Sequence, residues 1–210
     1  MSQSLQSILK ERRSANNFLP DVVIPASEFD EIFKLVKLAP SAFNLQHTHY
    51  VVITDKEQKE QIKAAAFYQH KVTTSSAVIV VLGDKLAYQQ AEKIYRGFLD
   101  LGIMDQPSFD STIQSIYAMY QGRGEDFQKE EAIRNASLSA MQLMLVAKDR
   151  GWDTCPMIGF DPDALHKVVN IPDQYIPVML ITIGKEDTNN RRPRGYRKPN
   201  GEFVTHGFFS

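Results

Sequence analysis

The sequence predicts an α+β fold in which helices surround a small sheet. Three short apolar runs, at 49–54, 77–82 and 175–183, have the composition of strands. The segments between them carry apolar residues at helical spacing, and neither an internal repeat nor a low-complexity linker divides the chain. We therefore expect one domain over residues 1–210, a length sufficient to bury a core of its own.

The first two elements are expected to be helices. Residues 3–12 place apolar side chains at positions i, i+3 and i+4 from Leu5, which suits one buried face. A second helix is expected to begin at Ser27, because its hydroxyl can cap the helix and acidic residues follow it. Pro40 ends this helical segment, since proline cannot continue a helix.

The following segments alternate between strand and helix. Residues 49–54 are rich in β-branched side chains, which favours a strand, and residues 56–67 have a helical pattern. The run 77–82 is continuously apolar and ends at Gly83. Such a run is typical of a strand that is buried on both faces.

The second half of the chain is expected to be largely helical. Residues 85–129 mix helical patches with glycines and a proline, which predicts a helical excursion from the core that covers a site. Residues 130–150 form the clearest helix, closed by Gly151, and the run 175–183 supplies the last strand. One face of this long helix is a stripe of mostly small residues that favours close packing: Ala132, Ile133, Ala136, Ala140, Leu143, Met144 and Ala147.

The composition excludes several classes of function. A net charge of −1 gives no attraction to nucleic acid or to an anionic membrane. The N-terminal residues lack the pattern of a signal peptide, and no run approaches the length of a membrane span. Cys155 is the only cysteine, so no intrachain disulfide can form. We expect a cytoplasmic protein.

Familiar catalytic motifs are absent from the sequence. It has no G-x-G-x-x-G, no phosphate-binding P-loop and no G-x-S-x-G nucleophile elbow. His47 and His49 would share a strand face, but no cysteine or carboxylate stands at metal-ligand spacing, so no metal is expected. Cys155 has two readings, a catalytic nucleophile or a small buried hydrophobic residue, and the second is the more common.

Three polar segments remain as candidates for a site. Arg12, Arg13, Ser14 and Asn16 offer guanidinium, hydroxyl and amide donors for a phosphate monoester, or form a solvated charge cluster at a helix end. The segment 39–46 carries Asn44 and Gln46, whose amides suit a flat heterocycle or their own loop backbone.

The third segment, 155–162, follows the long helix. Gly159 allows the backbone to approach a planar ligand, and Asp161 can cap a short helix that begins with Pro162. An ordinary turn between two helices is the alternative.

Taken together, these segments resemble the FMN-dependent nitroreductase family of the oxygen-insensitive type. The family pattern has an R-[RH]-S segment, then A-P-S-x-x-N-x-Q before a strand, then P-[MI]-x-G-F-[DN] after a long helix, and an arginine-rich C-terminal segment. The chain matches this pattern in order at Arg12-Arg13-Ser14, at 39–46, at 156–161 and at 194–199.

The resemblance implies a nitroreductase-like sandwich, with a small mixed or antiparallel sheet flanked by helices, in an intertwined homodimer that exchanges its C-terminal segments. It implies FMN at the dimer interface, contacted by both subunits. The implied phosphate ligands are Arg12, Arg13, Ser14, Asn16, Arg194 and Arg197. The implied contacts to the ribityl chain and ring are Pro40, Ser41 and Asn44 from the second subunit, Gln69 and Lys71 at the pyrimidine edge, and Pro156, Met157, Ile158 and Gly159 over the isoalloxazine.

The implied activity is hydride transfer from NAD(P)H, a transient co-substrate, to nitroaromatic, quinone or similar small acceptors by a ping-pong scheme. No side chain is catalytic in this scheme, and the Ile158 backbone N–H lies near flavin N5. Because the hard chemistry belongs to the flavin, the missing catalytic motifs are no obstacle. The alternatives are reduction of an enone, an aldehyde or free flavin, a flavin-binding protein without turnover, and a small-ligand module without flavin.

Overall fold

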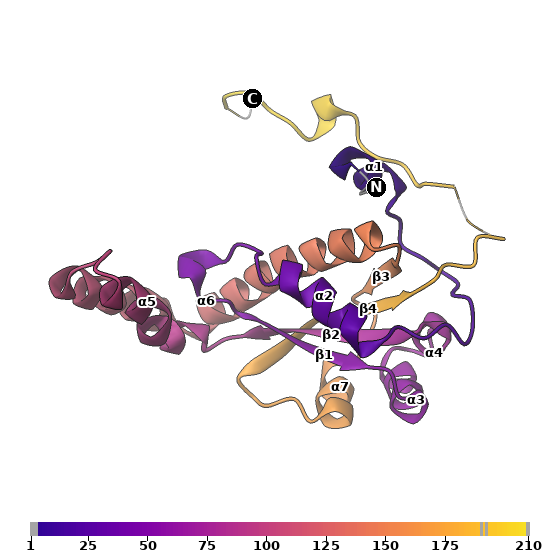
Figure 1. The fold of residues 1–210 in the computed structure, drawn as a ribbon, viewed down its shortest axis with the longest axis horizontal. Coiled ribbons are helices and arrows are strands. Elements are labelled where there is room, and N and C mark those ends of the chain that lie inside the picture. Colours follow the sequence, from indigo (N-terminus) through magenta and orange to yellow (C-terminus); the bar gives the residue numbers. More distant parts are fainter. Residues whose placement is uncertain (1–3, 190, 192, 209–210) are drawn as a thin grey trace.

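In a computed structural model of the chain, residues 4–189, 191 and 193–208 are described. Four strands form one sheet in the order β1-β2-β4-β3, and every neighbouring pair is antiparallel. The predicted α+β fold with a small sheet flanked by helices is confirmed (Figure 1). The strands are β1 (Thr48–Ile53), β2 (Ala77–Asp84), β3 (Asp153–Met157) and β4 (Tyr175–Gly184).

Helices supply the rest of the regular structure. In chain order the α-helices are α1 (Leu5–Glu11), α2 (Ala26–Val36), α3 (Lys56–Ala65), α4 (Lys71–Thr74), α5 (Ala91–Asp100), α6 (Gln106–Asp149) and α7 (Pro162–Val169). Short 3-10 turns are η1 (Ala42–Asn44), η2 (Ala87–Gln90) and η3 (Asn200–Glu202). No helix in these described residues is both long and apolar enough to cross a membrane.

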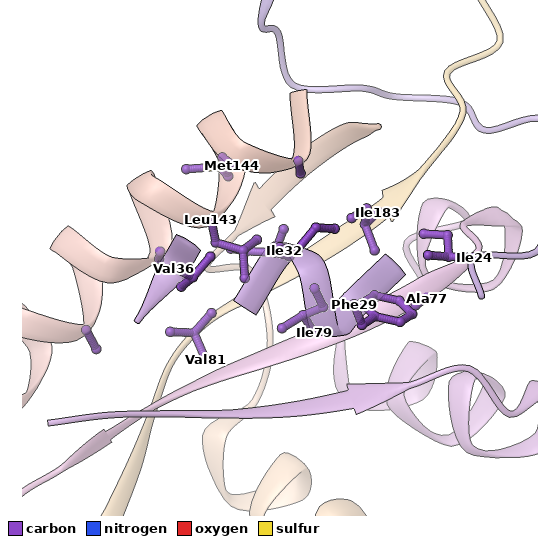
Figure 2. Packing of buried hydrophobic residues seen from close by; sticks show 14 residues of the cluster. Ile24, Phe29, Ile32, Val36, Ala77, Ile79, Val81, Leu143, Met144 and Ile183 are labelled. Atoms are coloured by element: carbon purple, nitrogen blue, oxygen red, sulfur yellow. The ribbon is translucent and has the colours of Figure 1, made fainter. Parts of the chain in front are cut away.

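The sheet separates two apolar cores, as the continuous apolar run of β2 predicts. Along β2, Ala77, Ile79 and Val81 face one core, to which α2 and the second half of α6 contribute (Figure 2). The alternate residues of β2 face the other core, with α3, α4 and α7 (Figure 1). Because successive strand side chains point to opposite faces, one strand serves both cores.

The small-residue stripe lets α6 lie almost in backbone contact with the sheet. A Cβ added at Gly83 would lie 2.8 Å from the carbonyl oxygen of Ala132. Gly151 takes a φ of 80° and follows the helix as expected. Ile133 departs from the expected stripe, because it is 38% exposed.

The region 85–129 is helical, as expected for an excursion, but it is continuous with the long helix. Helix α6 begins at Gln106 rather than at 130, and it is broken at Gly124 (φ 75°, ψ −171°). The part before the break pairs with α5 and extends beyond the sheet (Figure 1). A third apolar cluster joins this region to the loop before β1, and it consists of Leu45, Ala87, Tyr88, Ala91, Ile116, Tyr120 and Phe127.

Two other expectations of local structure, and one alternative, were wrong. Pro25, with extended ψ of 149°, occupies the N-cap of α2, so Ser27 lies inside the first turn. Helix α3 ends at Ala65, because Phe67 and Tyr68 take positive φ values of 52° and 57°. The alternative for the segment 155–162, an ordinary turn between two helices, is also wrong, because strand β3 follows α6.

Candidate functional site

A hollow of about 220 Å³ brings the N-terminal and C-terminal arginines together. Arg194 closes it by donating from Nη2 to the backbone oxygens of Lys10, at 2.5 Å, and Arg12, at 3.1 Å. These carbonyls belong to the end of α1, where a cation is favoured. The lining consists of Arg12, Arg13, Ser14, Asn16, Glu186, Arg191, Pro193, Arg194, Gly195 and Arg197.

The hollow has an excess of positive charge. Glu186 supplies a carboxylate to its lining, and that carboxylate is paired with Arg191. Burial, followed by the nearby guanidinium groups of Arg194 and Arg197, lowers the pKa of Arg12. A bound anion would remove this repulsion between cations, so the arrangement suits a small, highly charged anion such as a phosphate monoester.

The backbone that carries Ser14 is anchored to the sheet. Ser14 forms a parallel bridge with Thr154, and the Ala15 N–H donates to the Thr154 oxygen at 3.0 Å. The segment after α1 therefore runs beside β3, the edge strand. This pairing places the arginine hollow next to the residues that lead into the Gly159 turn.

Gln69 and Gly159 meet at the end of β3. Gln69 Nε2 donates to the Gly159 oxygen at 2.9 Å, and Oε1 has no partner among the described residues. Ile158, directly before Gly159, leaves its side chain 83% exposed. The turn after β3 thus presents backbone and an amide acceptor on the surface of the chain.

Lys71 connects this turn with the arginine hollow. Its Nζ lies 3.4 Å from Cys155 Sγ, and Cys155 follows Thr154, the residue that pairs with Ser14 of the hollow. Cys155 is 3% exposed, in agreement with its reading as a small buried hydrophobic residue. Pro156 and Met157 follow it in β3, and Met157 packs in the core between the sheet, α3 and α7.

The loop around Pro40, Ser41 and Asn44 lies elsewhere. It lines a separate cavity of about 190 Å³, together with Phe33, Tyr50 and other residues, and shares no lining residue with the arginine hollow. In Figure 1 it lies at the end of the sheet nearest α5, away from α1. One chain therefore brings together the predicted groups except this loop.

The loop has an unusual backbone. Phe43, Asn44 and Gln46 have φ values of 51°, 53° and 53°. Gln46 donates from its backbone to Ser41 Oγ at 3.0 Å and from Nε2 to the Asn44 oxygen at 3.4 Å. The side chain of Gln46 thus bonds its own loop, which was the alternative to ligand binding.

His47 and His49 do not share a strand face as expected. His47 precedes β1 and is 1% exposed, with Nε2 3.1 Å from the Tyr120 hydroxyl. His49 is exposed and packs on Tyr175. Within the described ranges, no group of three or more His, Cys, Asp or Glu is arranged to hold a metal.

Asn135 is a residue that the sequence reading missed. It is buried on α6, and its Oδ1 accepts a hydrogen bond from the Ala42 N–H at 2.7 Å. Its signal in the sequence is an asparagine within the stripe of buried alanines, where a polar side chain needs a partner.

The chain has clear relatives. The model of the Nitroreductase family matches residues 9–185. MhqN, a candidate NAD(P)H nitroreductase of Bacillus subtilis (strain 168), is 57% identical over 199 residues, which cover 95% of this chain and 97% of MhqN. The CLA biosynthesis enone reductase of Lactiplantibacillus plantarum is 29% identical over 188 residues, which cover 88% of this chain and 87% of the reductase.

A solved structure agrees with these relatives. A candidate nitroreductase from Exiguobacterium sibiricum 255-15, in complex with FMN, superposes with a TM-score of 0.88 at 34% identity. The match covers 99% of this chain and 100% of that one. The family model covers most of the chain, and the fold agrees with that of the solved structure. The chain therefore belongs to the nitroreductase family, a family of oxidoreductases.

Proposed function

We propose that the protein is an FMN-dependent oxidoreductase that takes hydride from NAD(P)H and passes it to nitroaromatic, quinone or similar electron-poor acceptors in a ping-pong scheme. The observation that carries the proposal is the cationic hollow around Arg12 and Arg197, connected through Cys155 and Lys71 to the contact between Gln69 and Gly159. The FMN that the related Exiguobacterium structure holds supports the same cofactor here.

The donor set fits the phosphate of FMN. Arg12, Arg13, Arg194 and Arg197 supply charge and bidentate geometry, and Ser14 supplies a neutral hydroxyl. The lowered pKa of Arg12 reflects burial among like charges that a phosphate dianion would neutralise. Asn16 lines the same hollow and can donate an amide hydrogen.

The second group of residues fits a flat ring with polar edges. Gln69 Oε1 can accept from a ring N–H while Nε2 stays on Gly159. The Lys71 ammonium would favour negative charge that develops at the pyrimidine edge. Pro156 to Gly159 would lie along the ring, with the Ile158 N–H directed to N5. Bound FMN supplies the hydride chemistry, so these residues need only hold it and adjust its electrostatics.

We propose a homodimer, because one protomer leaves the site incomplete. Pro40, Ser41 and Asn44 lie away from the arginine hollow and would reach the FMN held by a second copy. Apolar side chains on the outer face of α6 are exposed, with Leu138 at 49% and Met141 at 37%. Such a face is expected to be covered in the assembly. The C-terminal segment beyond Arg197 would cross to the same partner.

An enone is an alternative electron acceptor that one specific observation supports. The 29% identical relative from Lactiplantibacillus plantarum is named an enone reductase. Reduction of an enone would use the same cofactor site and differ only in the acceptor pocket. Comparing turnover with a nitroaromatic, a quinone and an α,β-unsaturated ketone separates these acceptors.

A visible absorption spectrum tests the proposal. We expect flavin bands in the purified protein or after reconstitution with FMN, and we expect them to bleach on anaerobic addition of NADH or NADPH. Reoxidation by the acceptor after the nucleotide has been removed would establish the ping-pong order. Flavin bands that neither nucleotide bleaches would indicate a flavin-binding protein without turnover, and no flavin binding after reconstitution would refute the assignment.

A further inference from the structure

Asn135 of α6 holds the backbone of the Pro40–Asn44 loop. Its side chain is 3% exposed, and Oδ1 accepts from the Ala42 N–H at 2.7 Å. Nδ2 donates to the Glu131 backbone oxygen at 2.7 Å and to Glu131 Oε2 at 3.2 Å. A flipped amide would set its NH₂ against the Ala42 N–H and its oxygen against the carboxylate, so these contacts fix its orientation.

The carboxylate that orients Asn135 is itself held. Glu131 is buried, and its Oε1 forms an ion pair with Arg134, three residues further along the same helix. The contacts therefore run from Arg134 through Glu131 and Asn135 to Ala42. A buried polar network in which each member has a partner fixes one geometry.

The loop needs such support because of its backbone. Phe43, Asn44 and Gln46 have positive φ, a conformation that non-glycine residues adopt only where their surroundings hold it. Helix α6 also holds the far end of the loop, because Tyr120 contacts His47 on the other side of the Gly124 break.

We propose that Asn135 is a positioning residue, which, oriented by Glu131, keeps the Pro40–Asn44 loop in the conformation that presents Ser41 and Asn44 to FMN. This inference rests on the proposed function. Asn135 does not touch the cofactor in this scheme and acts through the Ala42 N–H. Asn135 thus connects the part of α6 that packs in the core with the loop that would contact the FMN held by the partner.

The first test removes the oxygen that accepts the hydrogen bond from the Ala42 N–H. Asn135→Leu keeps the number and branching of the side-chain heavy atoms but leaves the Ala42 N–H without a partner, so we expect FMN to bind on the order of tenfold more weakly. The matched control is Ser139→Ala, one turn further along α6, where Ser139 Oγ lies 2.6 Å from the Tyr50 hydroxyl. This control also loses a buried hydrogen bond but leaves the Ala42 contact intact, and its FMN affinity should stay within about twofold of the wild type.

The second test replaces the amide of Asn135 by a carboxylate and measures FMN affinity as a function of pH. Asn135→Asp keeps an oxygen for Ala42 but sets a second carboxylate beside Glu131, with Arg134 the other charged group in this contact chain. Relative to the wild type at each pH, FMN affinity should fall as pH rises, because the two buried carboxylates then both ionise. Adding Glu131→Gln restores one donor between the two side chains and should remove this pH dependence.

A third measurement needs no cofactor. Hydrogen exchange in the flavin-free protein should be faster at residues 41–46 in Asn135→Leu and unchanged there in Ser139→Ala. Unaltered exchange in Asn135→Leu, or equal loss of FMN affinity in both variants, would overturn the inference. If the wild type binds no FMN, the proposed function fails, and the exchange data still decide whether Asn135 holds the loop.

Discussion

Gln69 and Gly159 lie 90 residues apart in the sequence and are joined by a hydrogen bond of 2.9 Å from Nε2 to the carbonyl oxygen. This bond connects the segment before α4 to the turn after β3. It also leaves Oε1 as the acceptor that the proposed function assigns to the ring edge. The side-chain amide of Gln69 therefore has two roles: Nε2 holds the turn after β3, and Oε1 is the proposed acceptor for the ring.

Replacing Gln69 by Leu should weaken FMN binding. The change removes the bond to Gly159 and the proposed acceptor for the ring, and a typical hydrogen bond contributes about 1 kcal/mol. We expect an increase in the dissociation constant of about tenfold, measured by quenching of FMN fluorescence. Gln61→Leu, at an exposed position on α3, is the control and should bind FMN like the wild type.

Replacing Arg12 and Arg197 together by Ala should cost several kcal/mol of FMN affinity. Each is expected to make a charge-assisted contact to the phosphate, worth roughly 1.5–3 kcal/mol. Lys34→Ala with Lys63→Ala removes the same charge from exposed ion pairs elsewhere and should have little effect. Riboflavin, which lacks the phosphate, should bind the double variant and the wild type equally. Undiminished FMN retention in the double variant would remove the phosphate assignment.

Lowering the pH should destabilise the protein through His47. Burial lowers the pKa of His47 to about 4, below its ordinary value of 6.5. Between these two values the unfolded chain binds a proton that the folded chain does not, so the free energy of unfolding falls as pH falls through this window. The full effect is about 3 kcal/mol and is complete only below pH 4.

His47→Gln separates this effect from the titration of carboxylates. Glutamine can keep a hydrogen bond to Tyr120 but does not titrate, so the loss of stability between about pH 7 and about pH 4 should be smaller than in the wild type. Urea unfolding at several pH values measures the difference. His206→Gln, in the exposed C-terminal segment, should leave the wild-type pH profile unchanged. Identical pH profiles for His47→Gln and the wild type would show that protonation of His47 does not contribute to the pH dependence of stability.

The elements that sequence predicted well are those with a strong local pattern. Strand β2 is apolar from Ala77 to Leu82, and the family motifs mark the arginine hollow and the Gly159 turn. Strand β3 was missed because it is a short edge strand with Pro156 in it, and pairing with β4 stabilises it rather than its own residues. Pro107, the proline of the region 85–129, does not break a helix, because it lies in the first turn of α6, where proline favours a helix start.

The local sequence pattern also could not predict that the candidate site is divided between the arginine hollow and the Pro40–Asn44 loop. The residues around Pro40 and Arg12 do not determine how far apart these two segments lie in the folded chain. The distance follows from the arrangement of α2 and the sheet, a long-range property of the fold. The hydrogen bond from Ala42 to Asn135 spans 93 residues for the same reason.

The protein should be a dimer at micromolar concentration, and Leu138→Glu should dissociate it. Leu138 is 49% exposed on the outer face of α6, so a charge there costs little within one protomer but is buried in the proposed interface. Sedimentation velocity measures the change, and FMN should be lost with the dimer. Leu35→Glu, at a residue of α2 that is 42% exposed, is the control. A monomeric variant that retains FMN would contradict the shared site.

Two glycine-to-alanine changes should have opposite effects on stability. A Cβ at Gly83 would lie 2.8 Å from the Ala132 oxygen and 2.9 Å from its carbonyl carbon. These are backbone atoms of a packed helix that cannot move aside, so Gly83→Ala should cost about 1–3 kcal/mol. A Cβ at Gly97 in α5 would meet nothing within 4 Å, and Gly97→Ala should gain roughly 0.5–1 kcal/mol because alanine restricts the unfolded chain. Chemical unfolding measures both changes. Equal stability of Gly83→Ala and the wild type would mean that α6 does not lie against β2 as closely as the structure has it.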